Sequence, residues 1–82
     1  MKQTIEILTI LSQIGDYLMP DKALYNEVRL TVRPVPTRAE FETEMQRLDS
    51  EGLVIGVTNE LTAARKWKIS DKGRAELAEA MS

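Results

Sequence analysis

The sequence predicts an α+β fold that is mostly helical and contains one β-hairpin. The main observation is a continuous stretch from Thr37 to Gly73 that reads, in order, as helix, glycine stop, strand, loop, second strand and helix start. The second is the helical spacing of apolar residues over residues 3–14 and 21–30. The 82 residues fit one domain, residues 1–82, and a chain this short buries only roughly 60% of its unfolded surface.

The first predicted helix runs from Gln3 to Ile14 and turns an apolar arc of roughly 160° toward the core. The arc consists of Ile7, Leu8, Ile10, Leu11 and Ile14. Met1, Ile5 and Leu8 form a second stripe at i, i+4, i+7 spacing. Two interpretations of this stripe stay open, because it either contacts a second copy in a homodimer or lies under the C-terminal helix.

Gly15 and Asp16 end this helix, and Pro20 suits the first position of the next one. The second helix is predicted from Asp21 to Leu30, although Leu30 itself does not fit its apolar face. The inward residues of this helix are Leu24, Tyr25 and Val28. Two prolines exclude a helix over residues 32–36 and predict a stiff connector there.

The third helix opens with a capping box in which Thr37 pairs with Glu40, three residues on. Its buried face is predicted to consist of Phe41, Met45 and Leu48. Gly52 ends the helix, because glycine accepts the left-handed conformation of a helix C-terminus.

The hairpin is predicted from LVIGV at residues 53–57 and RKWKI at residues 65–69. Side chains alternate along a strand, so Lys66 and Lys68 share one face and Trp67 and Ile69 share the other. We therefore interpret Trp67 as a core residue rather than a platform for stacking bases.

A last helix is predicted from Asp71 to Met81, with Ser70 as its N-cap. Asp71 in the first turn suits the positive end of the helix dipole. Leu77 and Met81 are the residues that this helix is expected to bury.

Composition narrows the possible chemistry. With no cysteine and no histidine, the chain has no thiolate or imidazole for a metal site or for acid–base catalysis, and neither a metal nor a cofactor is expected. Pairs of glutamates on helix surfaces would need a desolvated cleft to act as catalysts, so we do not expect an enzyme. No apolar run approaches the roughly 20 residues of a membrane span and no signal peptide is evident, which favours the cytoplasm and no membrane partner.

Residues 47–54, the hairpin and residues 66–77 resemble the winged helix-turn-helix domains of MarR-, PadR- and ArsR-type regulators from bacteria and archaea. The shared features are a leucine on the reading helix, a Gly-Leu-Val strand start, a basic wing and an Ile-Ser-x-x-Gly-Arg helix start. Here they are Leu48, Gly52–Val54, Arg65–Lys68 and Ile69–Arg74. The resemblance implies a three-helix core, a two- to three-stranded wing with Tyr17–Met19 as its short first strand, and a C-terminal helix.

Charge is unevenly distributed along the chain, although the net charge is only -2. Residues 65–74 hold five basic residues against Asp71, whereas residues 40–60 hold six carboxylates against Arg47. The carboxylates of the third helix are expected on its two flanks: Glu40, Glu44 and Glu51 on one, Glu42 and Asp49 on the other. An uncharged strip between the flanks faces outward and includes Thr43 and Gln46, with Arg47 beside it.

This pattern predicts contacts with double-stranded DNA. Gln46 and Arg47 suit adenine and guanine edges, and the wing cations suit phosphates. The candidate nucleic-acid-binding residues are Arg38, Thr43, Gln46, Arg47, Arg65, Lys66 and Lys68. The alternatives are a merely solvated helix face and lysines that protect a strand edge.

The function expected from the sequence is that of a small DNA-binding protein, either a transcriptional regulator or the DNA-binding subunit of a larger assembly. The alternative is a protein-interaction module whose working surface is the acidic flank of residues 40–51.

Overall fold

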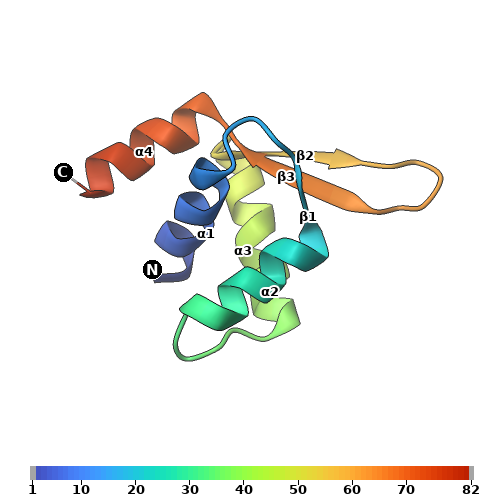
Figure 1. Ribbon diagram of the computed structural model, residues 1–82, viewed down its shortest axis with the longest axis horizontal. Helices are drawn as coiled ribbons and strands as arrows, with labels where there is room; N and C mark the ends of the chain where they lie inside the picture. Colours follow the sequence, from blue (N-terminus) through green and yellow to red (C-terminus); the bar gives the residue numbers. More distant parts are fainter. Residues whose placement is uncertain (1, 82) are drawn as a thin grey trace.

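The computed structural model describes residues 2–81, which form four helices and a three-stranded antiparallel sheet. In chain order the elements are α1 (Lys2–Gln13), β1 (Met19–Pro20), α2 (Asp21–Thr31), α3 (Arg38–Ser50), β2 (Val54–Thr58), β3 (Arg65–Ile69) and α4 (Asp71–Met81). The predicted α+β class is confirmed. The hairpin of β2 and β3 extends away from the helices, as Figure 1 shows.

The sheet has the strand order β1-β3-β2, so β3 is central and β2 lies at an edge. The predicted antiparallel hairpin is confirmed, with Gly56 opposite Trp67 and Val57 opposite Lys66. The first strand was predicted over Tyr17–Met19 but lies at Met19–Pro20, and Tyr17, 81% exposed, stands outside the sheet. Pro20 closes this strand opposite Lys66.

Both ends of α3 follow the local signals in its sequence. The Thr37 hydroxyl accepts from the amide of Glu40, whose carboxylate accepts from the amide of Thr37. At the other end, the Gly52 amide donates to Asp49 and the Leu53 amide donates to Leu48, while Gly52 has φ of +74°. This pair of bonds is a Schellman motif, so the predicted glycine stop is confirmed.

The core lies between the four helices and the inner face of the sheet. The predicted inward residues of α3 (Phe41, Met45 and Leu48) and of β3 (Trp67 and Ile69) are buried. The other fully buried large side chains are Ile7, Leu8, Leu11, Leu24, Val28 and Val54. None of the helices in residues 2–81 is long and apolar enough to cross a membrane.

One expectation for α4 needs correction, and the burial of Leu8 bears on the two interpretations of the stripe on α1. Leu77 is buried as predicted, but Met81 is 69% exposed, because the last turn of α4 lies at the far end of the molecule (Figure 1). Leu8 is only 1% exposed and belongs to the core, and Ile5 is partly buried against it. Met1 lies outside the described residues, so Ile5 is the one described residue of the stripe with surface left for a second copy.

Candidate nucleic-acid interface

A cleft of about 620 Å³ opens between α3, the start of α2 and the hairpin. Its lining consists of Pro20, Asp21, Lys22, Arg38, Glu42, Met45, Gln46, Ala63, Ala64, Arg65 and Trp67. Three of the predicted site residues therefore lie around one hollow, Arg38 and Gln46 on α3 and Arg65 on β3.

The buried indole of Trp67 holds the floor of this cleft in place. Its Nε1 donates a hydrogen bond of 2.8 Å to Oδ1 of Asp21 at the start of α2. The ring also lies against Gly56 on β2, where an added Cβ would stand only 2.7 Å from Cζ3. The indole of Trp67 thus attaches the hairpin to α2 and packs closely against Gly56 on the neighbouring strand.

Arg38 joins α3 to this floor. It forms ion pairs with Asp21 and with Glu42, the latter at 3.1 Å. Its guanidinium also lies 5.2 Å from the ring centre of Tyr25 and 5.4 Å from that of Phe41. Burial works against the charged form, but the pairing with both carboxylates outweighs it and raises the pKa of Arg38. The guanidinium of Arg38 is therefore already engaged in contacts within the chain, and its main role is to connect α3 to α2.

Arg65 and Gln46 keep their polar groups at the surface. Arg65 opens β3 on the same sheet face as Trp67, and its guanidinium lies 5.5 Å from the centre of that ring. Gln46 is an exposed residue of α3 on the opposite wall. A ligand that entered the cleft would meet both side chains at once.

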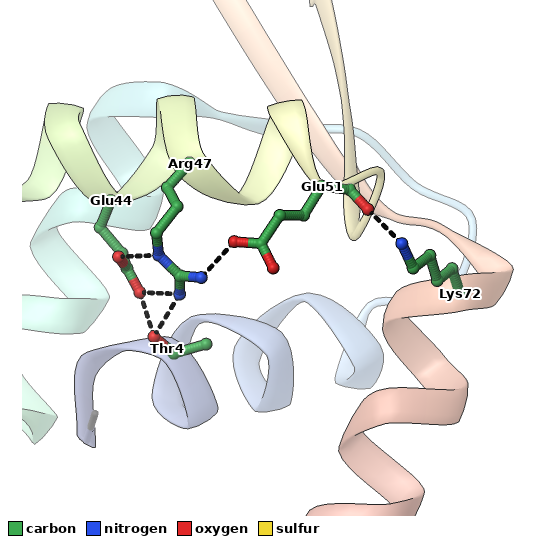
Figure 2. Close-up of polar contacts among 5 residues, drawn as sticks. All are labelled: Thr4, Glu44, Arg47, Glu51 and Lys72. Atoms are coloured by element: carbon green, nitrogen blue, oxygen red, sulfur yellow. Dashed lines mark hydrogen bonds and ion pairs between the residues drawn. The ribbon is translucent and has the colours of Figure 1, made fainter.

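Arg47, which was predicted to stand beside the outward strip, is exposed but does not line this cleft. Its guanidinium donates to both carboxylate oxygens of Glu44, at 2.9 and 2.8 Å, and is also paired with Glu51. It further donates to the hydroxyl of Thr4 on α1 at 3.0 Å, and Figure 2 shows this arginine between the two glutamates. Arg47 therefore fastens α3 to α1.

Glu44 was expected on a solvated acidic flank, but it is only 3% exposed. It is buried because α1 packs over this side of α3 and the Thr4 hydroxyl donates to its carboxylate. The hydrogen bonds from Arg47 lower the pKa of Glu44, the bond from Thr4 acts in the same direction, and burial opposes both. The pairing likewise raises the pKa of Arg47.

The remaining candidates lie elsewhere on the surface. Lys66 is exposed and Lys68 half-buried, on the sheet face opposite Trp67, as their alternation predicted. They are therefore not directed into the cleft. Thr43 is exposed on α3, one turn before Gln46 and Arg47.

Sequence reasoning missed Asp21, Lys22 and Glu42 as parts of the cleft. Glu42 stands four residues after Arg38, a spacing that indicates an ion pair on a helix. Asp21 reads in the sequence as an acid that favours a helix start, and nothing local points to Trp67, 46 residues away. Among residues 2–81 no group of three or more acidic side chains is arranged to hold a metal ion.

Comparison with known proteins returned no relative. No protein family, no curated protein and no solved structure matches this chain.

Proposed function

We propose that this chain is a winged-helix protein that binds double-stranded DNA, as a transcriptional regulator or as the DNA-binding subunit of a larger assembly. The observation that carries the proposal is the cleft, because it brings the uncharged Gln46 of α3 and the cation of Arg65 on the hairpin to one hollow. In this proposal α3 enters the major groove, where Gln46 meets base edges, and Arg65 contacts the backbone beside it.

The charges available in the cleft support a weak, salt-sensitive interaction. Asp21 and Glu42 are already paired with Arg38, whereas Lys22 and Arg65 form no ion pair within residues 2–81. Each phosphate that such a cation neutralises adds roughly 0.9 to the slope of log affinity against log salt. Two free cations therefore correspond to a slope of about 2 from the cleft alone.

The acidic flank offers less to a protein partner than its sequence suggests. Glu40 belongs to the capping box, Glu42 pairs with Arg38, and Glu44 and Glu51 pair with Arg47. Because each of these carboxylates already accepts a hydrogen bond or an ion pair within the chain, we favour DNA over a basic protein as the ligand. Homodimerisation through Met1, Ile5 and Leu8 is not part of the proposal, since Leu8 is buried.

The test is fluorescence anisotropy with a labelled random duplex of about 20 base pairs, titrated from about 50 mM salt upward. Arg65→Ala should weaken binding and reduce the salt slope by about 0.9. Arg29→Ala is the matched control, because it removes the same charge from an exposed site on α2 that does not line the cleft. A folded wild-type chain with no affinity for DNA at about 50 mM salt would overturn the proposal and favour the alternative, a protein-interaction module.

A further inference from the structure

The two edges of the sheet differ in how they are protected. β1 is only two residues long and ends in Pro20, which has no amide hydrogen to offer. β2 is five residues long, and its sequence VIGVT contains no proline, no lysine and no charge of either sign. Proteins usually guard exposed edges with such residues, so β2 is an unguarded edge.

The hydrogen-bond pattern shows which backbone groups on β2 are free. Ser70 donates to the carbonyl of Leu53, and Asn59 donates to that of Ala64. Since bonded pairs alternate along an antiparallel ladder, Ile55 and Val57 also bond toward β3. The amides and carbonyls of Val54, Gly56 and Thr58 therefore point to the open edge.

Two apolar side chains stand beside this edge. Ile55 is 42% exposed and Val57 is 47% exposed, both on the sheet face that carries Lys66 and Lys68. β-branched residues favour strand pairing. The edge thus combines unpaired backbone groups with apolar side chains.

We propose that β2 pairs antiparallel with β2 of a second copy, about a two-fold axis at Gly56, to form a continuous six-stranded sheet. Gly56 is the midpoint of the strand, so this register pairs Val54 with Thr58 of the other copy. The outward amides and carbonyls of the two strands then lie opposite one another and can form hydrogen bonds. The same register sets Ile55 against Val57 of the other copy, at positions where side chains approach closely.

A second copy fits this edge because the strand is complementary to itself. The absence of charge from Leu53 to Asn59 means that a two-fold axis brings no like charges together. Cross-strand pairs lie on one face, so both copies keep Trp67 and the adjoining cleft on the same side of the joined sheet. The proposal is independent of DNA, because the pairing needs no ligand.

The contact is small, and the dimer is correspondingly weak. Stable interfaces bury at least about 1,200 Å², which is more than two five-residue strands supply, so we expect association only at high protein concentration. Sedimentation of the full chain from about 10 μM to 1 mM should show a mass that rises toward twice that of the monomer.

Two double variants test the register. Ile55→Glu with Val57→Glu places each new carboxylate opposite Lys68 or Lys66 of its own chain, which protects the fold. Across the two-fold axis the carboxylates face one another, so association should weaken by about tenfold or more. Ile55→Lys with Val57→Glu instead sets opposite charges across the axis and should recover association relative to the first variant.

Amide hydrogen exchange, measured residue by residue, shows whether the two copies associate through the edge of β2. With rising concentration, the amides of Gly56 and Thr58 should exchange more slowly, while those of Ile55 and Val57 are already bonded within the chain and should not change. A wild type that is monomeric at about 1 mM overturns the proposal and leaves the edge unpaired or to a strand of another protein. It is equally overturned if the two-glutamate variant associates as tightly as the wild type, or if a dimer forms without protection of Gly56.

Discussion

The indole of Trp67 is hydrogen-bonded to Asp21, whose second carboxylate oxygen is paired with Arg38. One carboxylate thereby ties the hairpin, α2 and α3 together at the floor of the cleft. The angle between the hairpin and α3 determines whether both reach one ligand, so this contact positions Arg65 and Gln46 relative to each other.

Asp21→Ala should destabilise the chain by about 1–3 kcal/mol. The substitution leaves the buried Nε1 of Trp67 without an acceptor and removes one partner of Arg38. Asp21→Asn keeps an acceptor for the indole and should cost less. Urea unfolding followed by Trp67 fluorescence measures both variants, and equal losses would mean that the bond to the indole contributes nothing.

Glu44 should make the stability of the chain depend on acidity. Its pKa in the folded state lies below the ordinary value of 4.5, so its stabilising effect is present above that value and is lost as the pH falls through the lower, folded pKa. Glu44→Gln should therefore unfold more easily than the wild type at neutral pH, and the difference should shrink in acid.

The measurement for Glu44 is the free energy of unfolding in urea, taken between about pH 7 and pH 3. Glu42→Gln is the matched control, because its side chain is 57% exposed and its carboxylate contacts Arg38 at the surface. A difference for Glu44→Gln that stays constant with pH would contradict the prediction.

Local signals predicted the parts of the fold that depend on neighbours in sequence. The capping box of Thr37, the stop at Gly52 and the alternation around Trp67 each need only a few adjacent residues, and each is confirmed. The burial of Glu44 was not predictable in this way, because it depends on Thr4, 40 residues away. A helical wheel predicts on which side of α3 the Glu44 side chain lies, but it does not predict that α1 covers that side.

The candidate site also combines features that the sequence predicted and features that it did not. Arg38 and Arg65 were both candidate site residues, and the cleft does bring them together with Gln46. Arg47 was selected for its place beside the outward strip, yet two glutamates at i-3 and i+4 hold it toward α1. These spacings are visible in the sequence and favour an ion-pair network over a free base-reading side chain.

Gly73→Ala should destabilise the chain by about 1–3 kcal/mol, although alanine is the better helix former by roughly 1 kcal/mol. A Cβ at this position in α4 would stand 2.1 Å from the backbone oxygen of Leu53, which cannot move aside easily. Ala75→Gly, at an exposed site in the same helix, is the control and should cost only the roughly 1 kcal/mol of helix propensity. Stabilisation by Gly73→Ala in urea unfolding would refute the close contact.

Lys66→Ala and Lys68→Ala distinguish the two faces of the hairpin as DNA contacts. Both lysines lie on the face opposite Trp67, so a duplex held in the cleft should lose less affinity with either change than with Arg65→Ala. Salt titrations of the three variants provide the comparison, with a slope change of about 0.9 for each true phosphate contact. A larger effect of the lysines would place the DNA on the outer face instead.

Gln46→Ala should reduce discrimination between DNA sequences rather than general affinity. The side chain lies on the wall of the cleft formed by α3 and carries no charge, so it adds nothing to the attraction of phosphates. On a preferred site selected from random duplexes, its loss should cost about 1–3 kcal/mol, while binding to unrelated duplexes stays within error. Ser50→Ala, also exposed on α3 but outside the cleft lining, is the control. If Gln46→Ala weakens all duplexes alike, the amide does not read bases, and the cleft contributes only through its cations.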